Sequence, residues 1–305
     1  MAQWGTVAII GAGTMGRQIA LTLAGRGVPV RLYDPAPDAL TAARDRIAAD
    51  APQLVEEGFF SGPADAISER VTPVATLAEA VQGAWLVIEC APERLELKRA
   101  LYGELSALTP RDVILATNSS SFRSRLLADA TQHPSRLLNT HFYNLPWQRS
   151  GVELMTCGQT DPAVIDRVEA FLRDVGFVPV IVRGESTGFI YNRIWRAIKR
   201  ESLRVVAEGL ATPEEVDRLF CLAMGTQLGP FGLMDRVGLD VVADIERHYA
   251  AESGRPEDGP PAFLEEMVRA GRLGIKTGHG FYDYPDPPFT RPAWPPPEAA
   301  GIRPP

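Results

Sequence analysis

Three glycines near the start of the chain have the spacing of a loop that holds a dinucleotide. Gly11, Gly13 and Gly16 form the pattern GxGxxG, with Thr14 and Met15 inside it. In such a loop the first glycine permits a tight turn, the second lets the backbone approach a pyrophosphate, and the third lets the next helix pack closely. The free N–H groups at the start of that helix then hold the phosphates. The alternative is a glycine turn kept for packing alone.

The context of the motif favours NAD. The motif follows an apolar run at residues 6–10, opens a helical stretch at 17–26, and precedes a second apolar run at 28–33 that ends at Asp34. A carboxylate there accepts hydrogen bonds from the adenosine ribose and repels a 2′-phosphate, which disfavours NADP. Arg31 lies three residues earlier in the same strand, so we expect it to point elsewhere. FAD shares the fingerprint, but a helical region follows here rather than a second nucleotide-sized one.

His141 is the histidine whose position suggests catalysis. It ends a predicted parallel strand at residues 137–140, and open α/β sheets bind ligands at the carboxyl ends of their strands. An imidazole exchanges a proton near neutral pH, as a general base must. His133, His248 and His279 fall in a surface turn, a polar helix end and a glycine loop. Taken on its position alone, a histidine such as His141 is more often structural than catalytic.

Strands and helices alternate over the first part of the chain. Beyond the second apolar run, further strands are predicted at residues 71–75, 85–89, 113–117, 137–140, 152–155 and 178–182. Helices are predicted at residues 38–50, 53–57 and 94–108, with another beginning at Asp161-Pro162. This alternation predicts an α/β fold with a doubly wound, mostly parallel sheet of Rossmann type.

The pattern changes near residues 184–188, after which no strand is predicted. Ile190, Ile194 and Ile198 repeat at helical spacing, and residues 212–215 (TPEE) form a capping box that opens another helix. The prediction is a dinucleotide-binding domain at 1–186, a smaller all-helical substrate and dimerisation domain at 187–284, and an extended or mobile proline-rich tail at 285–305.

Composition disfavours several other classes of protein. A net charge of −7 and a pI near 5.3 argue against nucleic acid or an anionic membrane as the main partner. We see no apolar run near the ~20 residues that span a bilayer, and no signal peptide. Cys90, Cys157 and Cys221 are isolated and form no CxxC pattern, so we expect neither a metal site nor a disulfide framework. A cytoplasmic location is therefore expected.

Eight stretches, taken in order, resemble the 3-hydroxyacyl-CoA dehydrogenase family, which includes the lambda-crystallin/gulonate and carnitine dehydrogenases. They are GAGTMG (11–16), IECAPE (88–93), NSSS (118–121), HFYN (141–144), VEL (152–154), TGFIYNR (187–193), GPFGLMD (229–235) and GIKTGHGFY (274–282). The resemblance spans residues 6–284. It implies NAD-dependent oxidation or reduction of a β-hydroxy substrate, a place in fatty acid metabolism, and a homodimer formed through the helical domain.

The resemblance also assigns site residues. His141 is implied as the general base, and Glu153, 12 residues later as in the family, would hold its imidazole. Ser120 and Asn192 fall where the family holds the substrate oxygens. The positions near the nicotinamide and its ribose fall on Glu93, Lys98 and Asn118. The plain alternatives are that residues 118–121 only cap a turn and that Asn192 only packs between helices.

Two departures from the family concern the substrate. The loop after His141 carries Trp147 and Arg149 where the family usually has Asn-Pro and apolar residues. Asp50 and Glu57 stand where CoA-specific members carry a serine and a basic residue, and carboxylates would repel CoA phosphates.

Three hypotheses about function remain open. The substrate could be a CoA or carrier-protein thioester. It could instead be a free hydroxy acid or specialised metabolite whose carboxylate pairs with Arg149. The third hypothesis is an NAD-binding protein without turnover, which the retained spacing of His141 and Glu153 disfavours.

Overall fold

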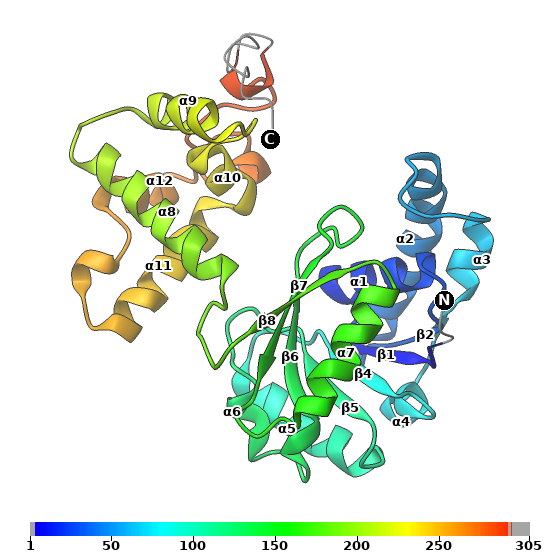
Figure 1. Ribbon diagram of the computed structural model, residues 1–305. Coiled ribbons are helices and arrows are strands. Elements are labelled where there is room, and N and C mark those ends of the chain that lie inside the picture. The colour runs from blue at the N-terminus through cyan, green and yellow to red at the C-terminus, as the bar shows by residue number, and fades with distance from the viewer. Residues whose placement is uncertain (1–3, 292–293, 295–305) are drawn as a thin grey trace. The chain divides into compact units, whose positions relative to one another are not determined.

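The computed structural model describes residues 4–291 and residue 294, apart from the side chain of residue 252. Contacts within the chain divide it into two compact units, unit 1 (Met1–Ile190) and unit 2 (Tyr191–Pro305) (Figure 1). None of the described helices is both long and apolar enough to cross a membrane.

Unit 1 is built on an eight-stranded sheet with the order β3-β2-β1-β4-β5-β6-β7-β8. The strands are β1 (Val7–Ile10), β2 (Val30–Tyr33), β3 (Val71–Pro73), β4 (Leu86–Glu89), β5 (Ile114–Thr117), β6 (Leu137–Phe142), β7 (Gly151–Thr156) and β8 (Val178–Val182). Neighbouring strands pair in parallel except β6 and β7, which are antiparallel. Only a short loop joins β6 to β7, and a parallel pair would need a longer crossover. The predicted mostly parallel sheet is confirmed.

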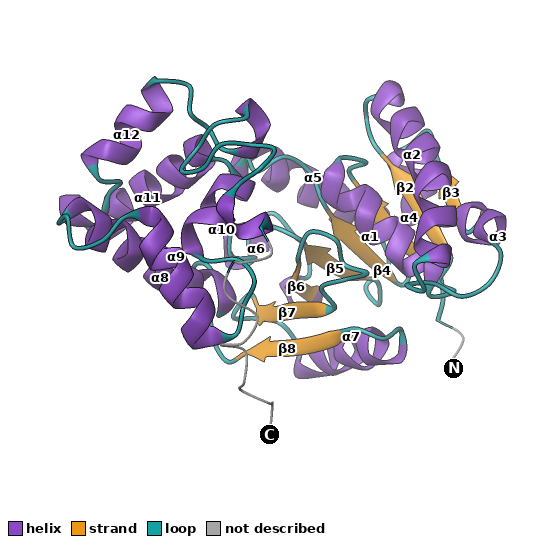
Figure 2. Cartoon of the chain, turned by 90° about the horizontal axis from the view of Figure 1, so that it is seen from above, coloured by secondary structure: helices purple, strands orange, loops and turns teal. Residues whose placement is uncertain are grey.

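Helices cover both faces of this sheet. One face carries α1 (Thr14–Gly25), α2 (Pro37–Glu56), α3 (Ala64–Glu69) and α7 (Pro162–Asp174); the other carries α4 (Leu77–Val81), α5 (Leu95–Leu108) and α6 (Arg125–Ala128); η1 (Pro134–Arg136) is a 3-10 turn before β6. Val7 and Ile9 of β1 enter the first core, and Ala8 and Ile10 enter the second. Figure 2 shows β7 and β8 side by side, with α7 against β8. Burial on both faces explains the continuous apolar runs of the central strands.

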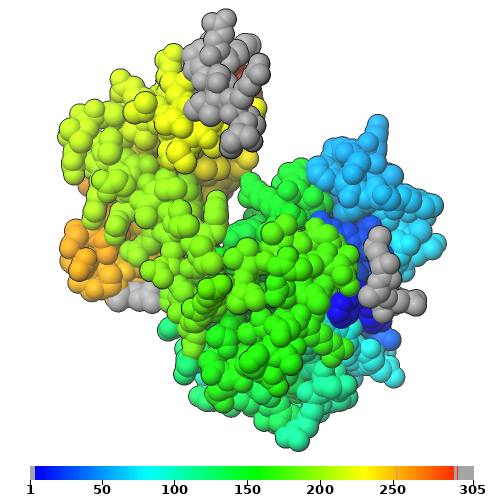
Figure 3. All heavy atoms as spheres, in the orientation of Figure 1, coloured from blue at the N-terminus to red at the C-terminus, as the bar shows by residue number. Residues whose placement is uncertain are grey.

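The helical stretches predicted at residues 38–50 and 53–57 form one helix, α2, with Pro52 inside it. The predicted interruption is therefore wrong. Ile47, Ala51 and Leu54, on both sides of Pro52, are at most 5% exposed in the core. Their burial offsets the backbone hydrogen bond that a proline removes. In Figure 3, α2 and α3 (light blue) form a projecting part of the surface of unit 1.

The secondary-structure elements described in unit 2 are helices and 3-10 turns, joined by loops that contain isolated β-bridges. Its elements are α8 (Tyr191–Ala207), α9 (Pro213–Met224), α10 (Pro230–Val237), α11 (Leu239–Ser253) and α12 (Ala262–Arg269), with the 3-10 turns η2 (Pro256–Asp258), η3 (Ile275–Thr277) and η4 (Pro288–Thr290). The predicted capping box is confirmed, because Thr212 Oγ1 accepts from Glu215 N and Glu215 Oε2 accepts from Thr212 N.

The described part of the proline-rich tail packs against unit 2. Phe289, in η4, has its ring 5.4 Å from that of Tyr282, measured between centroids. The expectation of an extended or mobile tail does not hold for this segment. Residues 292–293 and 295–305 lie outside the described residues.

Two buried aspartates join the helices of unit 2. Asp217 accepts from the N–H groups of Phe231 and Gly232, at the start of α10, at 2.7 and 2.8 Å, and from the Tyr282 hydroxyl at 2.9 Å. Asp235, in α10, accepts from Tyr282 N at 3.0 Å. Burial raises the pKa of Asp217 to about 6, although these hydrogen bonds oppose the shift. The aspartates thus tie the 229–235 and 274–282 segments together.

Replacing Asp217 should destabilise unit 2. Asp217→Ala leaves two buried N–H groups and a hydroxyl without their acceptor, which we expect to lower the free energy of unfolding by about 3 kcal/mol. Asp217→Asn keeps one acceptor oxygen and should cost less. Thermal and urea denaturation measure both changes, with Glu266→Ala on the exposed face of α12 as the control. Equal stability of Asp217→Ala and the control would contradict this account.

Candidate active site

The glycine loop joins β1 to α1 at the point where the strand order reverses. β1 pairs with both β2 and β4, and open α/β sheets bind ligands in the crevice beyond such a switch point. Gly11 has a φ of +109°, and a Cβ on it would lie 2.7 Å from Cys90 O. A Cβ on Gly16 would lie 1.8 Å from Gly11 O. Packing alone therefore requires glycine at positions 11 and 16.

Gly13 is different. Its φ is −64°, and a Cβ built on it has nothing within 4 Å. Neither backbone conformation nor packing within the described chain requires glycine at position 13, so the space beside it is open to a ligand. Gly13 also precedes α1, whose first turn has no acidic residue and no side-chain cap. Thr14 and Met15 open that turn, so its N–H groups can receive phosphate oxygens.

Asp34 is tied to the glycine loop. Its Oδ2 accepts from Ala12 N at 2.8 Å, and its Oδ1 accepts from Ala36 N at 2.9 Å. These bonds hold a partly exposed carboxylate at the end of β2, where an adenosine ribose would lie. Arg31 points away, as expected, and donates to Glu79 O at 3.2 Å. The loop, the uncapped helix and Asp34 together fit NAD.

Lys98 is enclosed, at 1% exposure. Its Nζ lies 2.6 Å from Glu89 Oε1 and 3.1 Å from Glu93 Oε2, and it donates to Ala91 O at 3.1 Å. Burial opposes its charge, but Glu89 and Glu93 keep the pKa of Lys98 above its ordinary value. The predicted action of Lys98 on the cofactor would therefore pass through Glu93, which this network places after β4.

The loop after β5 separates two neighbouring serines. Ser119 is buried; its Oγ contacts Glu93 and accepts from Phe122 N at 2.7 Å. Ser120 is exposed, with no hydrogen bond to the described part of the chain. Asn118 Oδ1 accepts from Phe142 N at 2.9 Å and so joins the ends of β5 and β6. Ser119 therefore stabilises the loop, while the Ser120 hydroxyl is available to a ligand.

His141 and Glu153 are direct partners across the antiparallel pair β6–β7, which accounts for their spacing. Opposite residues in such a pair direct their side chains to the same face. His141 Nδ1 lies 2.9 Å from Glu153 Oε2, and the two residues are 5% and 3% exposed. When Nδ1 carries the proton of this hydrogen bond, the lone pair of Nε2 is free to accept another. The geometry is that of an oriented general base.

Three further groups hold this pair. Tyr143 donates its hydroxyl to Glu153 Oε2 at 2.7 Å, and Ile190 N donates to Glu153 Oε1 at 2.8 Å. The Phe189 ring stacks on His141, with centroids 4.8 Å apart and planes 19° apart. Phe189 has a φ of +55°, which is rare for a bulky residue and indicates local backbone strain.

Asn192 belongs to the first turn of α8, in unit 2, where it is half-buried. Its predicted place on a substrate oxygen beside His141 stays a prediction. Among the described residues, no group of three or more His, Cys, Asp and Glu side chains could hold a metal ion.

The loop between β6 and β7 is anchored on α1. Gln18 Oε1 accepts from Leu145 N at 2.9 Å, and Leu145 has a φ of +58°. Trp147 packs against the core beneath α1 and α7, so its bulk supports the loop. Arg149 is exposed and can reach a ligand from solvent.

Asp50 does not present an uncompensated negative charge. Its carboxylate lies 2.9 Å from Arg17 Nη1 and 2.8 Å from Arg46 Nε. Glu57 Oε1 accepts from Gln53 Nε2 at 2.7 Å. Arg17 and Arg46 therefore compensate the charge of Asp50, and the argument that Asp50 repels CoA phosphates fails, whereas Glu57 has an uncharged partner.

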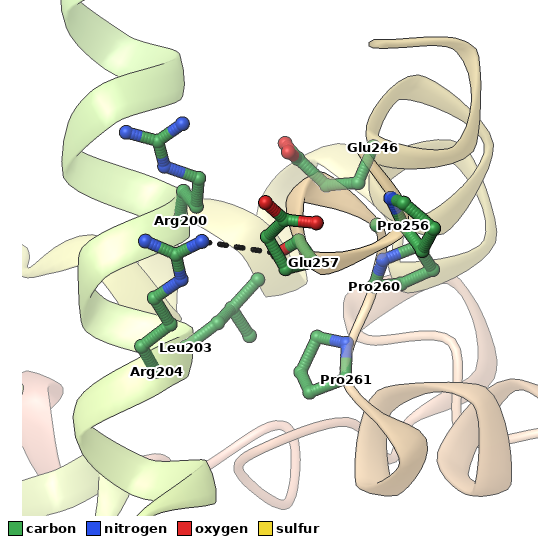
Figure 4. Close-up of a pocket in the computed structure, with 9 residues that line it drawn as sticks. Arg200, Leu203, Arg204, Glu246, Pro256, Glu257, Pro260 and Pro261 are labelled. Atoms are coloured by element: carbon green, nitrogen blue, oxygen red, sulfur yellow. Dashed lines mark hydrogen bonds between the residues drawn. The ribbon is translucent and has the colours of Figure 1, made fainter. Parts of the chain in front are cut away.

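A pocket in unit 2 is formed by α8, α11 and the η2 segment (Figure 4). Arg200 and Arg204 project from α8, and Arg204 donates to Glu257 O at 3.0 Å. Arg200 also donates to Asp258 at 2.9 Å. The pocket contains no histidine among its described lining residues, and its arginines already have acceptors. We therefore place the candidate active site at His141.

Sequence reasoning missed several residues of this site. Tyr143 could have been found, because it follows His141 by two positions, the spacing that returns to one face of a strand. The pairing of Gln18 with Leu145, and of Ile190 N with Glu153, joins segments distant in sequence and leaves no local pattern. Phe189 lies in a segment that the resemblance included but to which it gave no role.

Two family models match the chain: the 3-hydroxyacyl-CoA dehydrogenase NAD-binding domain at residues 6–186 and the 3-hydroxyacyl-CoA dehydrogenase C-terminal domain at residues 188–284. A 3-hydroxybutyryl-CoA dehydrogenase of Mycobacterium tuberculosis is 34% identical over 91% of this chain and 98% of its own. A 5-formyl-3-hydroxy-2-methylpyridine 4-carboxylate 5-dehydrogenase of Mesorhizobium japonicum is 31% identical over 91% and 90%. The crystal structure of (S)-3-hydroxybutyryl-CoA dehydrogenase from Ralstonia eutropha superposes with a TM-score of 0.85, at 32% identity over 92% of this chain and 99% of that one. These matches confirm the predicted family and its NAD cofactor.

Substitutions at Gly13 and Gly16 should separate binding from packing. Gly13→Ala meets no protein atom, so we expect the unliganded stability to be unchanged while NADH affinity falls roughly tenfold or more, because the methyl group occupies the approach of the pyrophosphate. Gly16→Ala should destabilise unit 1 by roughly 3 kcal/mol or prevent folding. NADH fluorescence titration and thermal denaturation measure the two effects. Wild-type NADH affinity in Gly13→Ala would overturn the assignment of this loop.

Proposed function

Because the chain belongs to the 3-hydroxyacyl-CoA dehydrogenase family, whose members are NAD-dependent oxidoreductases acting on CH–OH groups, we propose that it interconverts a 3-hydroxyacyl thioester and the 3-oxoacyl thioester. The observation that carries the proposal is the buried His141–Glu153 pair, which orients one imidazole nitrogen toward the carboxylate and leaves the other for substrate.

The proposed chemistry assigns His141 the proton and the cofactor the hydride. The glycine loop, the start of α1 and Asp34 would hold NAD, which would supply a hydride acceptor for the carbon that carries the hydroxyl. His141 Nε2 takes the hydroxyl proton, so that the electrons of the O–H bond form the carbonyl and no alkoxide has to persist. Glu153 stabilises the imidazolium through Nδ1, as a carboxylate does in a catalytic triad. In the reverse direction the same imidazolium returns the proton.

Further roles are proposed for the polar groups of the surrounding loops. The exposed Ser120 hydroxyl can donate to the substrate oxygen, and Asn192 would supply a second donor. The Asn118 carbonyl oxygen is used by Phe142 N, which orients the amide –NH₂ group for a ligand. Glu93, placed by Lys98 and Ser119, would face the nicotinamide ribose.

A free hydroxy acid or specialised metabolite is the second candidate substrate. Arg149 is exposed in the loop next to His141 and could pair with a carboxylate. One relative at 31% identity is named for a pyridine carboxylate rather than a thioester. The thioester is favoured because the 34% identical relative is named for a CoA thioester, and because Arg17 and Arg46 compensate the charge of Asp50. The intact hydrogen-bonded pair speaks against a protein without turnover.

We also propose that the protein acts as a cytoplasmic homodimer formed through unit 2. Four apolar side chains of unit 2 are strongly exposed, namely Ile194 (56%), Leu210 (71%), Leu219 (68%) and Met224 (65%). Exposed apolar surface of this kind is typical of a protein interface. The three cysteines are free thiols, as in a reducing compartment.

The test is oxidation of NADH by acetoacetyl-CoA. We expect activity in the wild type, and a loss of roughly 10²–10⁴-fold in kcat/KM for His141→Ala with NADH binding retained, because the general acid–base is removed. His133→Ala, on the surface beside Arg111, is the matched control.

CoA itself separates the two candidate substrates. Competition by CoA, or a rise in melting temperature when it is added, supports the thioester. Absence of both, together with His141-dependent activity on a free hydroxy acid, would transfer the proposal to the second candidate. Full activity of His141→Ala would overturn the role of His141.

A further inference from the structure

The Tyr143 hydroxyl and the His141 ring use the same oxygen of Glu153. Tyr143 donates to Oε2 at 2.7 Å, and His141 Nδ1 lies 2.9 Å from that atom. Ile190 N donates to the other oxygen at 2.8 Å. The bond from Ile190 fixes one end of the carboxylate, and the two side chains fix the other end. Glu153 can therefore rotate only by breaking more than one hydrogen bond.

The ring of Tyr143 is held as firmly as its hydroxyl. It meets the His141 ring edge-on, with centroids 5.0 Å apart and planes at 68°. Gly151 lies beside it, where a Cβ would be in ordinary van der Waals contact with Tyr143 Cε2, at 3.5 Å. Phe189 covers the other side of His141 as a stacked ring. The hydroxyl is thus directed at Glu153 by packing on both sides of the pair.

A second donor on Oε2 changes how strongly the carboxylate can hold an imidazolium. A hydrogen bond to a carboxylate stabilises its negative charge and draws on the same lone pairs that the histidine uses. The Tyr143 bond is stronger when His141 is neutral, because protonated His141 competes for the oxygen. By linkage, Tyr143 favours neutral His141. A base that must accept and return a proton in each cycle requires such a balance.

We propose that Tyr143 is a positioning residue of the proton-transfer pair: its hydroxyl fixes Glu153 Oε2 opposite His141 Nδ1 and weakens the hold of His141 on the transferred proton. The inference rests on the proposed function insofar as His141 is the base. Glu153 from β7 and Tyr143 after β6 are titratable side chains that face His141. Phe189, near the end of unit 1, faces His141 with an uncharged ring.

The first experiment requires no turnover. The ring nitrogens of His141 are followed by NMR as a function of pH in the NADH-bound protein, with the signal assigned by its absence in His141→Asn. Tyr143→Phe keeps the ring and removes only the hydroxyl, and we expect the titration midpoint of His141 to rise by roughly half a pH unit. Tyr284→Phe, which removes a hydroxyl bonded to Asp235 in unit 2, is the matched control and should leave the midpoint in place.

The second experiment is the pH profile of acetoacetyl-CoA reduction, in which His141 must be protonated. In Tyr143→Phe we expect the alkaline limb of kcat/KM to move upward with the NMR midpoint. We also expect kcat to fall roughly threefold to tenfold, because the carboxylate is less well fixed, with KM within about twofold. A merely structural role would lower stability without moving the limb.

The outcomes separate this inference from the proposed function. An inactive wild type overturns the thioester proposal, yet the NMR titration still tests Tyr143. An unchanged or lowered midpoint in folded Tyr143→Phe overturns the inference, even if acetoacetyl-CoA is turned over. If Tyr143→Phe does not fold, replacement of the tyrosines by 3-fluorotyrosine, whose hydroxyl is a stronger hydrogen-bond donor, must lower the midpoint of His141 or the inference fails.

Discussion

The antiparallel pairing of β6 with β7 is the contact on which the candidate site depends. It places His141 opposite Glu153 and lets both side chains emerge on one face at the end of a sheet that is otherwise parallel around them. A carboxylate at 3% exposure is costly unless its oxygens find donors. Glu153 finds them in an imidazole, a phenol and a backbone N–H. The hydrogen bond that helps to satisfy the buried carboxylate therefore also orients the imidazole of His141.

The glycines of the loop between β1 and α1 differ in what requires them. Gly11 and Gly16 are fixed by contacts of backbone with backbone, which would persist whether or not a ligand bound. Gly13 has no such constraint. Packing within the chain therefore explains the glycines at positions 11 and 16 but not the glycine at position 13. The hydrogen bond from Ala12 N to Asp34 ties the glycine loop to the carboxylate at the end of β2. The Gln18–Leu145 bond extends this rigidity from α1 to the loop after His141.

The sequence predicted the elements better than it predicted their contacts. The strands, the glycine loop and the Thr212 cap carry local signals, namely apolar runs, special backbone conformations and short-range hydrogen bonds. The continuity of α2 through Pro52 was not predictable from propensity, because it depends on burial against a distant sheet. The compensation of Asp50 by Arg17 was missed for the same reason, since the two residues are 33 positions apart.

For the site residues, too, the sequence indicated which residues matter better than it indicated their contacts. His141, Glu153 and Asn118 could be named from motifs, but motifs do not reveal what each side chain touches. Lys98 looked like a cofactor ligand and is enclosed by Glu89 and Glu93. Ser119 and Ser120 are indistinguishable in sequence, yet one is buried against Glu93 and the other faces solvent. Burial decides such cases, and burial is a property of the folded chain.

The segment that ends unit 1 helps to hold the His141–Glu153 pair. Phe189 covers His141 in a strained backbone conformation, and the next N–H, of Ile190, holds Glu153. Strain of this kind persists only when surrounding contacts over-determine it, here the stacking on one side and the carboxylate on the other. α8 begins at the next residue and carries Asn192 in its first turn. One short stretch of backbone therefore both covers the imidazole of His141 and holds the carboxylate of Glu153, and its strained conformation is matched by those two contacts.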